Sequence, residues 1–238
     1  MAGEQLLYNR PLPGARVNMA HTLAKGLVGC WLLNENGGMR AMDASPHNNH
    51  GTLVGFTDPP RRPFNGQSYD GTATYINVGL PTSLSPTTAI TMEAWFKAFS
   101  IGNGPALISK WYDGGATRGY LLQVVSTGDI KIGVNSGSEL LSDTGEVVVD
   151  TWYHAVGTYD SNTMRIYKNG SQIKSAAATG GLSLMNENTN IGRDPNPGGA
   201  YFTGLIALVR IYGRALSAEE VKAFYISPYK PMGLPLFF

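Results

Sequence analysis

Residues 150–173, which read DTWYHAVGTYDSNTMRIYKNGSQI, carry the clearest structural pattern in the chain. Residues 152–159 and 164–168 are rich in aromatic, apolar and β-branched side chains, and Asp160-Ser161-Asn162 between them favours a turn. Asn169-Gly170 follows, and this dipeptide is the strongest short signal for a hairpin, because a type I′ turn needs positive φ at both central residues. The stretch therefore predicts antiparallel strands joined by tight turns.

The same pattern continues on both sides of this stretch. Short apolar or alternating segments bounded by Gly, Asp or Asn occur at 26–33, 73–78, 90–96, 107–111, 119–125, 130–134, 189–192 and 204–212. Many short strands with regular turn signals are typical of a sandwich or barrel. One short helix is predicted from about Ala218 to Tyr225, because Ser217 and Glu220 form a capping box.

The composition agrees with an all-β domain and excludes several classes of function. The 238 residues include 30 Gly and 14 Pro, and only 15% are charged. A single cysteine, Cys30, excludes an internal disulfide framework. The formal net charge of +1 provides no overall field for nucleic acid or an anionic membrane, so we expect neither as a partner. The chain lacks both an apolar run long enough to span a membrane and a signal-peptide pattern, which predicts synthesis in the cytoplasm.

The two ends differ from the middle of the chain. Residues 1–25 are predicted to form an N-terminal arm, residues 26–225 the folded domain and residues 226–238 an apolar tail rich in proline. Apolar residues at both ends are predicted assembly contacts: Leu6, Leu7, Tyr8, Leu236, Phe237 and Phe238. The alternative is that both ends are unstructured.

Six landmarks in order show a family resemblance over about 200 residues. They are GLVGCWLLNENGG (26–38), MDASPHNNHGTLVG (42–55), SYDGTATYINVG (68–79), ITMEAWFKA (90–98), the stretch 150–173, and YFTGLIALVRIYGRALSAEEV (201–221). These landmarks resemble the laminin-G-like jelly roll of the concanavalin A-like lectin and glucanase superfamily. The resemblance implies an all-β jelly-roll sandwich of two antiparallel sheets with one short C-terminal helix, and the predicted extended arms at both ends lie outside it. It implies no single function, because one fold hosts lectins, glycosidases and structural modules.

The sequence argues against an enzyme. Glycosidases need two carboxylates on either side of the scissile bond, and glycosidases of this superfamily carry a Glu-x-Asp-x-Glu type cluster on one strand. This chain has no such cluster and no Gly-x-Ser-x-Gly motif. His154 lies in a predicted core strand, where a packed structural role is expected.

The resemblance also raises the question of calcium, which many members of this fold bind. Asp43, Asn48 and Asp70 are the candidate oxygen ligands. The acidic pair that often follows Gly-x-Ile in the family's closing strand is replaced here by Ala207 and Leu208. The alternative role for the aspartates is turn formation through hydrogen bonds from side chain to backbone.

A sugar site would need aromatic rings beside polar groups on a loop face. Two groups of residues meet this requirement: Trp111, Tyr112 and Asp113, and Arg193, Asp194 and Tyr201. For Trp111 the alternative is a place in the core, where Trp31, Trp95 and Trp152 are expected.

Two functions remain after these exclusions. The first is a non-enzymatic structural protein of a bacteriophage virion, a capsid decoration or cement protein, whose arms contact capsid or other virion proteins. This hypothesis places the protein in the virion after synthesis in the host cytoplasm, and it allows a homo-oligomer and an exposed surface that binds glycans. The second is a lectin-like adhesion module that binds carbohydrate with or without calcium. No cofactor is required by either function.

Overall fold

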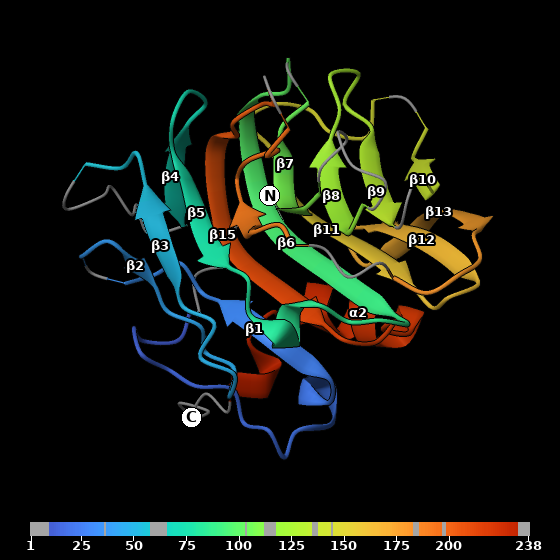
Figure 1. Cartoon of the computed structure of the whole chain (residues 1–238), viewed down its shortest axis with the longest axis horizontal. Helices are drawn as coiled ribbons and strands as arrows, with labels where there is room; N and C mark the ends of the chain where they lie inside the picture. The colour runs from blue at the N-terminus through green and yellow to red at the C-terminus, as the bar shows by residue number, and fades with distance from the viewer. Residues whose placement is uncertain are drawn as a thin grey trace.

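The protein is described by a computed structural model covering residues 10–35, 37–57, 66–102, 104–111, 118–134, 138–143, 145–182, 186–196 and 199–232. Within these residues the chain forms two antiparallel sheets that pack face to face, as Figure 1 shows. One α-helix, α2 (Ala218–Ile226), follows the last strand. The predicted two-sheet antiparallel sandwich with a short C-terminal helix is therefore confirmed.

The first sheet, called sheet A here, contains seven of the described strands. They are β1 (Leu27–Trp31), β4 (Gln67–Asp70), β6 (Ile90–Ser100), β11 (Trp152–Tyr159), β12 (Thr163–Lys168), β13 (Ser171–Ala177) and β15 (Thr203–Tyr212). The order is β1-β15-β6-β11-β12-β13, and β4 also pairs with β15. Asn169 and Gly170 join β12 to β13 with φ of 51° and 80°, so the predicted hairpin turn is confirmed.

The second sheet, called sheet B here, contains eight of the described strands. They are β2 (Arg40–Ala41), β3 (Gly51–Val54), β5 (Tyr75–Gly79), β7 (Ala106–Lys110), β8 (Tyr120–Val124), β9 (Ile130–Val134), β10 (Ser138–Leu141) and β14 (Thr189–Ile191). Their order is β10-β9-β8-β7-β14-β5-β3-β2. Two 3-10 turns, η1 (Thr22–Ala24) and η2 (Thr82–Leu84), precede β1 and β6, and a third, η3 (Lys230–Met232), follows α2.

The main core lies between the two sheets and follows from alternation along the strands. On β6, Ile90, Met92 and Phe96 are buried in the cluster between the sheets. Ile132 and Leu122 from sheet B belong to the same cluster. Burial of these alternate residues orients both sheets, because a shift of one residue would turn every side chain to the other face.

The outer face of sheet A is covered by a second buried layer. The intervening positions of β6 and β11 place Trp95 and Trp152 on this face, where Val221 and Phe224 of α2 pack in the same cluster. Ser217 caps α2 by accepting the N–H of Glu220, and the Glu220 carboxylate accepts the N–H of Ser217, so the predicted capping box is confirmed. The burial predicted for Trp31, Trp95 and Trp152 is confirmed as well.

The described parts of both terminal segments lie on this same outer face. The N–H of Val17 donates to the carbonyl of Ala44 over 3.0 Å, and the N–H of Asn18 donates to the carbonyl of Pro231 over 2.8 Å. Val17 and Tyr229 are buried in the second cluster. Figure 1 shows the blue N-terminal segment beside the red C-terminal turn. The predicted assembly contacts Leu6, Leu7, Tyr8, Leu236, Phe237 and Phe238 lie outside the described residues.

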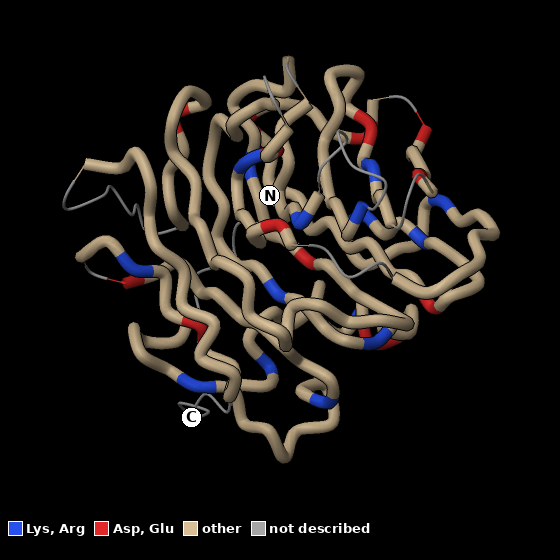
Figure 2. The backbone as a smooth tube through the Cα atoms, viewed as in Figure 1, with Lys and Arg blue, Asp and Glu red and all other residues tan. Residues whose placement is uncertain are grey.

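Charges of both signs are interspersed along the backbone in Figure 2. Among the described residues, no helix has the length and apolar character that crossing a membrane requires.

Candidate functional site

The outer face of sheet B carries a row of polar side chains. On β5, Ile76 and Val78 point into the core, so the alternate residues Tyr75 and Asn77 point outward and are half-buried. Asn77 pairs across β5 and β14 with Asn190.

The row continues on either side of this pair. Asn77 faces Thr52 of β3, and Asn190 faces Ser109 of β7. Cross-strand partners lie on the same face of a sheet, so four hydrogen-bonding side chains form one line.

The chain turns sharply after β14 and adds two further residues beside this row. Gly192 has φ of 84°, and a Cβ there would lie 2.5 Å from the ring of Tyr69, so the position requires glycine. Arg193 and Tyr201 then form an isolated antiparallel bridge. The hydroxyl of Ser109 donates to the carbonyl of Arg193 over 2.6 Å, which fixes the backbone of Arg193 to β7.

Arg193, Tyr75 and Tyr201 come together as one cluster, called the aromatic–arginine cluster here. The guanidinium carbon of Arg193 lies 4.8 Å from the ring centre of Tyr75 and 5.4 Å from that of Tyr201. The two ring centres are 6.1 Å apart and the rings are tilted by 56°. The guanidinium therefore lies within the range of a cation–π interaction with both rings.

The guanidinium of Arg193 has no polar partner among the described residues. Its Nε–H group is buried and donates to no acceptor there. All three residues of the cluster are half-buried, so each keeps an exposed part. The arrangement can stack on the face of a sugar ring through the tyrosines and can donate hydrogen bonds through the arginine.

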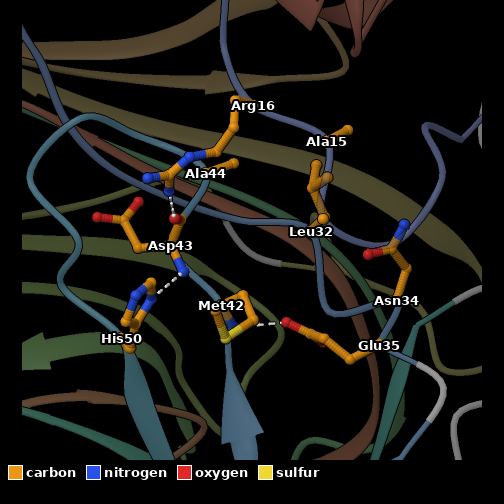
Figure 3. Close-up of a pocket in the computed structure, with 10 residues that line it drawn as sticks. Ala15, Arg16, Leu32, Asn34, Glu35, Met42, Asp43, Ala44 and His50 are labelled. Atoms are coloured by element: carbon orange, nitrogen blue, oxygen red, sulfur yellow. Dashed lines mark hydrogen bonds between the residues drawn. The ribbon is translucent and has the colours of Figure 1, made fainter.

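The predicted metal ligand Asp43 organises its own loop. Its Oδ1 accepts the N–H groups of Cys30 and Ser45, and its Oδ2 accepts the hydroxyl of Ser45 and the N–H of Asn49, all within 2.6–2.8 Å. The N–H of Asp43 donates to Nδ1 of His50, as Figure 3 shows. The carboxylate is buried and already accepts four hydrogen bonds, which is the predicted alternative of a turn-forming aspartate.

The surroundings of Asp43 form a small cavity of about 140 Å³, which Figure 3 shows. Arg16 lines it and donates to the carbonyl of Asp43 and to Oδ1 of Asn48 over 2.6 Å each. The Glu35 carboxylate accepts the N–H of Met42. The polar groups of this cavity are thus largely committed to one another.

The predicted ligand Asp70 also closes a turn. Its Oδ1 accepts the N–H groups of Thr72, Ala73 and Thr74 and the hydroxyl of Thr74. Desolvation alone would raise the pKa of Asp70, but these hydrogen bonds outweigh it and lower the pKa below its usual value.

No group of three or more His, Cys, Asp or Glu that could hold a metal ion occurs within the described ranges. Calcium binding by Asp43, Asn48 and Asp70 stays a prediction. It would require the ion to compete with the hydrogen bonds that the two carboxylates already accept.

A buried ionic group lies beneath α2 on the outer face of sheet A. Oε1 of Glu93 lies 2.9 Å from Nε2 of His154 and 2.9 Å from Nη2 of Arg210. Arg210 also donates to the carbonyl of Pro228 over 2.8 Å and lies 3.9 Å above the ring of Phe224. His154 is fully buried, so its predicted structural role is confirmed.

This environment explains the acidity of Glu93. Burial would raise the pKa of Glu93, but the charge of Arg210 and the hydrogen bond with His154 outweigh burial and lower it. Cys30 lies in the same layer, and burial raises the pKa of its thiol to about 12. Cys30 is a free, buried cysteine that packs as a small apolar residue.

A comparison with protein families identifies the chain. The model of the concanavalin A-like lectin/glucanases superfamily matches residues 70–222. The chain belongs to this superfamily. The matched range runs from the end of β4 into α2, so it includes all three residues of the aromatic–arginine cluster. No curated protein sequence matches the chain significantly.

Solved structures with the same concanavalin A-like fold share little sequence with this chain. Domain 4 of AbnA, a GH43 extracellular arabinanase from Geobacillus stearothermophilus in complex with arabinotriose, is 17% identical with a TM-score of 0.64, over 84% of this chain and 98% of that one. The binding domain of Paraclostridial Mosquitocidal Protein 1 is 15% identical with a TM-score of 0.63, over 87% of this chain and 53% of that one.

A third similar structure is the CBM40 of Ruminococcus gnavus IT-sialidase bound to α2,3-sialyllactose. It is 16% identical with a TM-score of 0.52, over 61% of this chain and 86% of that one. At these identities the likenesses show the fold, which this chain shares with carbohydrate-binding domains.

The concanavalin A-like scaffold separates the residues predicted to bind sugar. Arg193 and Tyr201 meet in the aromatic–arginine cluster. The N–H of neighbouring Asp194 donates to the carbonyl of Ala200, and its carboxylate accepts the N–H of Asn196. Asp194 thus has a role in shaping the loop.

Trp111 does not provide the exposed ring that was predicted. It is fully buried and packs with Ala106 and Leu121, and its ring lies so close to Gly133 of β9 that a Cβ there would be 2.9 Å from it. Tyr112 and Asp113 lie outside the described residues.

The sequence reading missed Tyr75, Asn77 and Asn190 as site residues. The signal for Tyr75 and Asn77 was present, because they alternate with the buried Ile76 and Val78 and must point outward. For Asn190 there was no such signal, because its strand of three residues is buried throughout.

Proposed function

We propose that this protein is a non-enzymatic carbohydrate-binding module that binds a sugar at the aromatic–arginine cluster. The observation that carries the proposal is the pairing of two outward tyrosine rings with a polar row on one face of sheet B. Tyrosine rings supply a flat apolar surface for the C–H face of a sugar, while amide and guanidinium groups bind its hydroxyls.

The roles of the carboxylates support binding without catalysis. Glu93 is buried in an ion pair, and the carboxylates of Asp43 and Asp70 accept hydrogen bonds from their own turns. None of these three is placed for acid or base catalysis on a sugar.

The comparisons support the same proposal by analogy. One similar structure is a complex with arabinotriose and another with α2,3-sialyllactose, and both contain domains of this fold. Analogy of fold raises the expectation of sugar binding but does not name the sugar.

Tyr75→Ala and Tyr201→Ala test the proposal on an array of immobilised glycans. Each change removes one ring of the cluster, so glycan binding should fall at least about tenfold, since an aromatic contact and its stacking area are lost. Phe99→Ala is the matched control, because Phe99 is an exposed aromatic residue on β6 in the other sheet. Absence of binding to any glycan by the unmodified protein would refute the proposal.

A second proposed role is attachment of this module to a bacteriophage virion as a capsid decoration or cement protein. Its support is geometric: the described terminal segments meet on the outer face of sheet A, whereas the aromatic–arginine cluster lies on the outer face of sheet B. Attachment through one face would leave the other free to bind. In this proposal the protein is made in the host cytoplasm, and its anchors are Leu6, Leu7, Tyr8, Leu236, Phe237 and Phe238.

Density-gradient sedimentation of lysate from the native source tests this second role. Mass spectrometry would follow the protein through the gradient. We expect the protein to sediment with dense particles, at a fixed ratio to the major shell protein. A copy number near that of the shell protein would indicate decoration. Recovery only as a free monomer or small oligomer would refute virion attachment.

A further inference from the structure

We infer that the ligand of the aromatic–arginine cluster is an acidic sugar, whose carboxylate is bound by the guanidinium of Arg193. This inference rests on the proposed function and specifies the class of sugar. Arg193 differs from Arg165, Arg210 and Arg214 because it has no carboxylate partner among the described residues.

Three other arginines pair with carboxylates within the fold. Arg165 lies 2.6 Å from Asp160, Arg210 lies 2.9 Å from Glu93, and Arg214 lies 2.6 Å from Glu220. Arg193 has no carboxylate and no hydrogen-bond acceptor among the described residues, and its Nε is buried. A half-buried cation with no anionic partner favours an anionic ligand, because burying a charge is costly unless it is paired.

The two tyrosine rings hold the guanidinium without using its N–H groups. A cation–π contact engages the face of the cation, at 4.8 Å and 5.4 Å here, and leaves its edges available for hydrogen bonds. Two parallel N–H groups of a guanidinium match the two oxygens of a carboxylate. The hydrogen bond from Ser109 to the carbonyl of Arg193 keeps the residue in place.

Neighbouring groups fit the rest of a sugar. The Oδ1 of Asn77 accepts the N–H of Gly79 over 2.8 Å, and its amide NH2 has no hydrogen bond within the described ranges, so it can bind a hydroxyl. The closest acidic residue in sequence, Asp194, accepts a hydrogen bond from the N–H of Asn196 within its own loop. Its charge would oppose an anion, so bidentate contact with Arg193 must outweigh this repulsion.

The experiment compares acidic sugars with neutral counterparts, of which the methyl ester and methyl glucoside differ from their acidic partners only at the carboxylate. Titration calorimetry would measure the full chain against α2,3-sialyllactose, its methyl ester and lactose, and against methyl glucuronide and methyl glucoside. The two acidic probes distinguish a sialic acid from a uronic acid. Loss of a charge-assisted hydrogen bond should weaken binding about tenfold to a hundredfold, both in the methyl ester and in Arg193→Gln.

Three variants and the ionic strength provide the controls. Arg193→Lys keeps the charge but loses the planar fork, so it should restore only part of the affinity. Arg165→Gln removes an arginine from β12 in the other sheet and should leave binding unchanged. Added salt should weaken binding of the acidic probe more than binding of its neutral partner. Melting curves of each variant show whether it remains folded.

The outcomes separate the inference from the proposed function. Selective binding of an acidic probe that depends on Arg193 supports both. Equal binding of the acid and its ester, or acid-selective binding that survives Arg193→Gln, overturns the inference and leaves the sugar-binding proposal standing. If no glycan, acidic or neutral, binds the protein on the array or in calorimetry, both the proposed function and the inference are overturned.

Discussion

Removing one partner of the buried pair between Glu93 and Arg210 should destabilise the fold strongly. Both side chains are almost completely buried, at 0% and 2% exposure, and Nη2 of Arg210 lies 2.9 Å from Oε1 of Glu93. Loss of either partner leaves the other charge buried without its ion-pair partner, which costs about 3–5 kcal/mol. Proteins have a total stability of about 5–15 kcal/mol, so Glu93→Met or Arg210→Met should remove a large share of it.

Urea unfolding followed by tryptophan fluorescence measures the effect, because Trp95 lies 5.0 Å from His154 beside the pair. With about 2–4 °C for each kcal/mol in a chain of this length, the melting temperature should fall by about 6–20 °C. The double variant should lose less than the sum of the two single variants, by about 1–3 kcal/mol, because the two charges are coupled. Costs under about 1 kcal/mol for each single variant, or strictly additive costs, would refute the reasoning.

The pH dependence gives a second measurement of the same pair. The pKa of Glu93 is lowered in the folded state, so its ionisation stabilises the protein above the unfolded pKa of about 4.3. This contribution is lost as the pH falls from there through the lower folded pKa. Glu93→Met should therefore show a shallower loss of stability below about pH 4 than the unmodified protein. An unchanged acid slope would mean that Glu93 is not the ionised partner.

Three further changes test other parts of the structure. Trp152→Ala should cost about 3–5 kcal/mol in denaturant unfolding, because the ring is buried under α2, and a cost below about 1 kcal/mol would contradict its burial. Asp43→Asn should cost about 1–3 kcal/mol, since an amide cannot accept all four hydrogen bonds. If Asp43, Asn48 and Asp70 hold calcium, a chelator should lower the melting temperature of the unmodified protein, and an unchanged melting temperature would remove that site. Ser217→Ala should cost about 1 kcal/mol by removing the cap of α2, and no measurable cost would show that packing alone holds the helix.

Local patterns in the sequence were sufficient to predict much of the fold. The alternation along 90–96 predicted the inward face of β6, Asn169-Gly170 predicted the turn after β12, and Ser217 with Glu220 predicted the start of α2. Each signal acts over a few neighbouring residues, so the sequence contains the cause in one place. The short strands β2, β3, β4 and β10, of two to four residues each, were not predicted, because they are too short to show a period.

The site depended on contacts between distant parts of the chain. Tyr75 lies on β5, whereas Arg193 and Tyr201 follow β14, and only the pairing of these two strands in sheet B brings the three together. The sequence placed Arg193 and Tyr201 among the candidates but had no means to join them to Tyr75 or to separate them from Trp111.

The sequence by itself determined most of the longer strands, the helix and the residues that face the core, because hydrophobic periodicity and turn chemistry are local, and its resemblance to the superfamily implied the two-sheet fold. Only the tertiary structure decided which polar and aromatic residues stabilise the fold and which remain available to bind a ligand. Asp43 and Asp70 stabilise the fold through hydrogen bonds, and Trp111 does so through burial. Arg193 remains without an acidic partner in the described structure. Whether a side chain is committed depends on its neighbours in space, which strand order and register create.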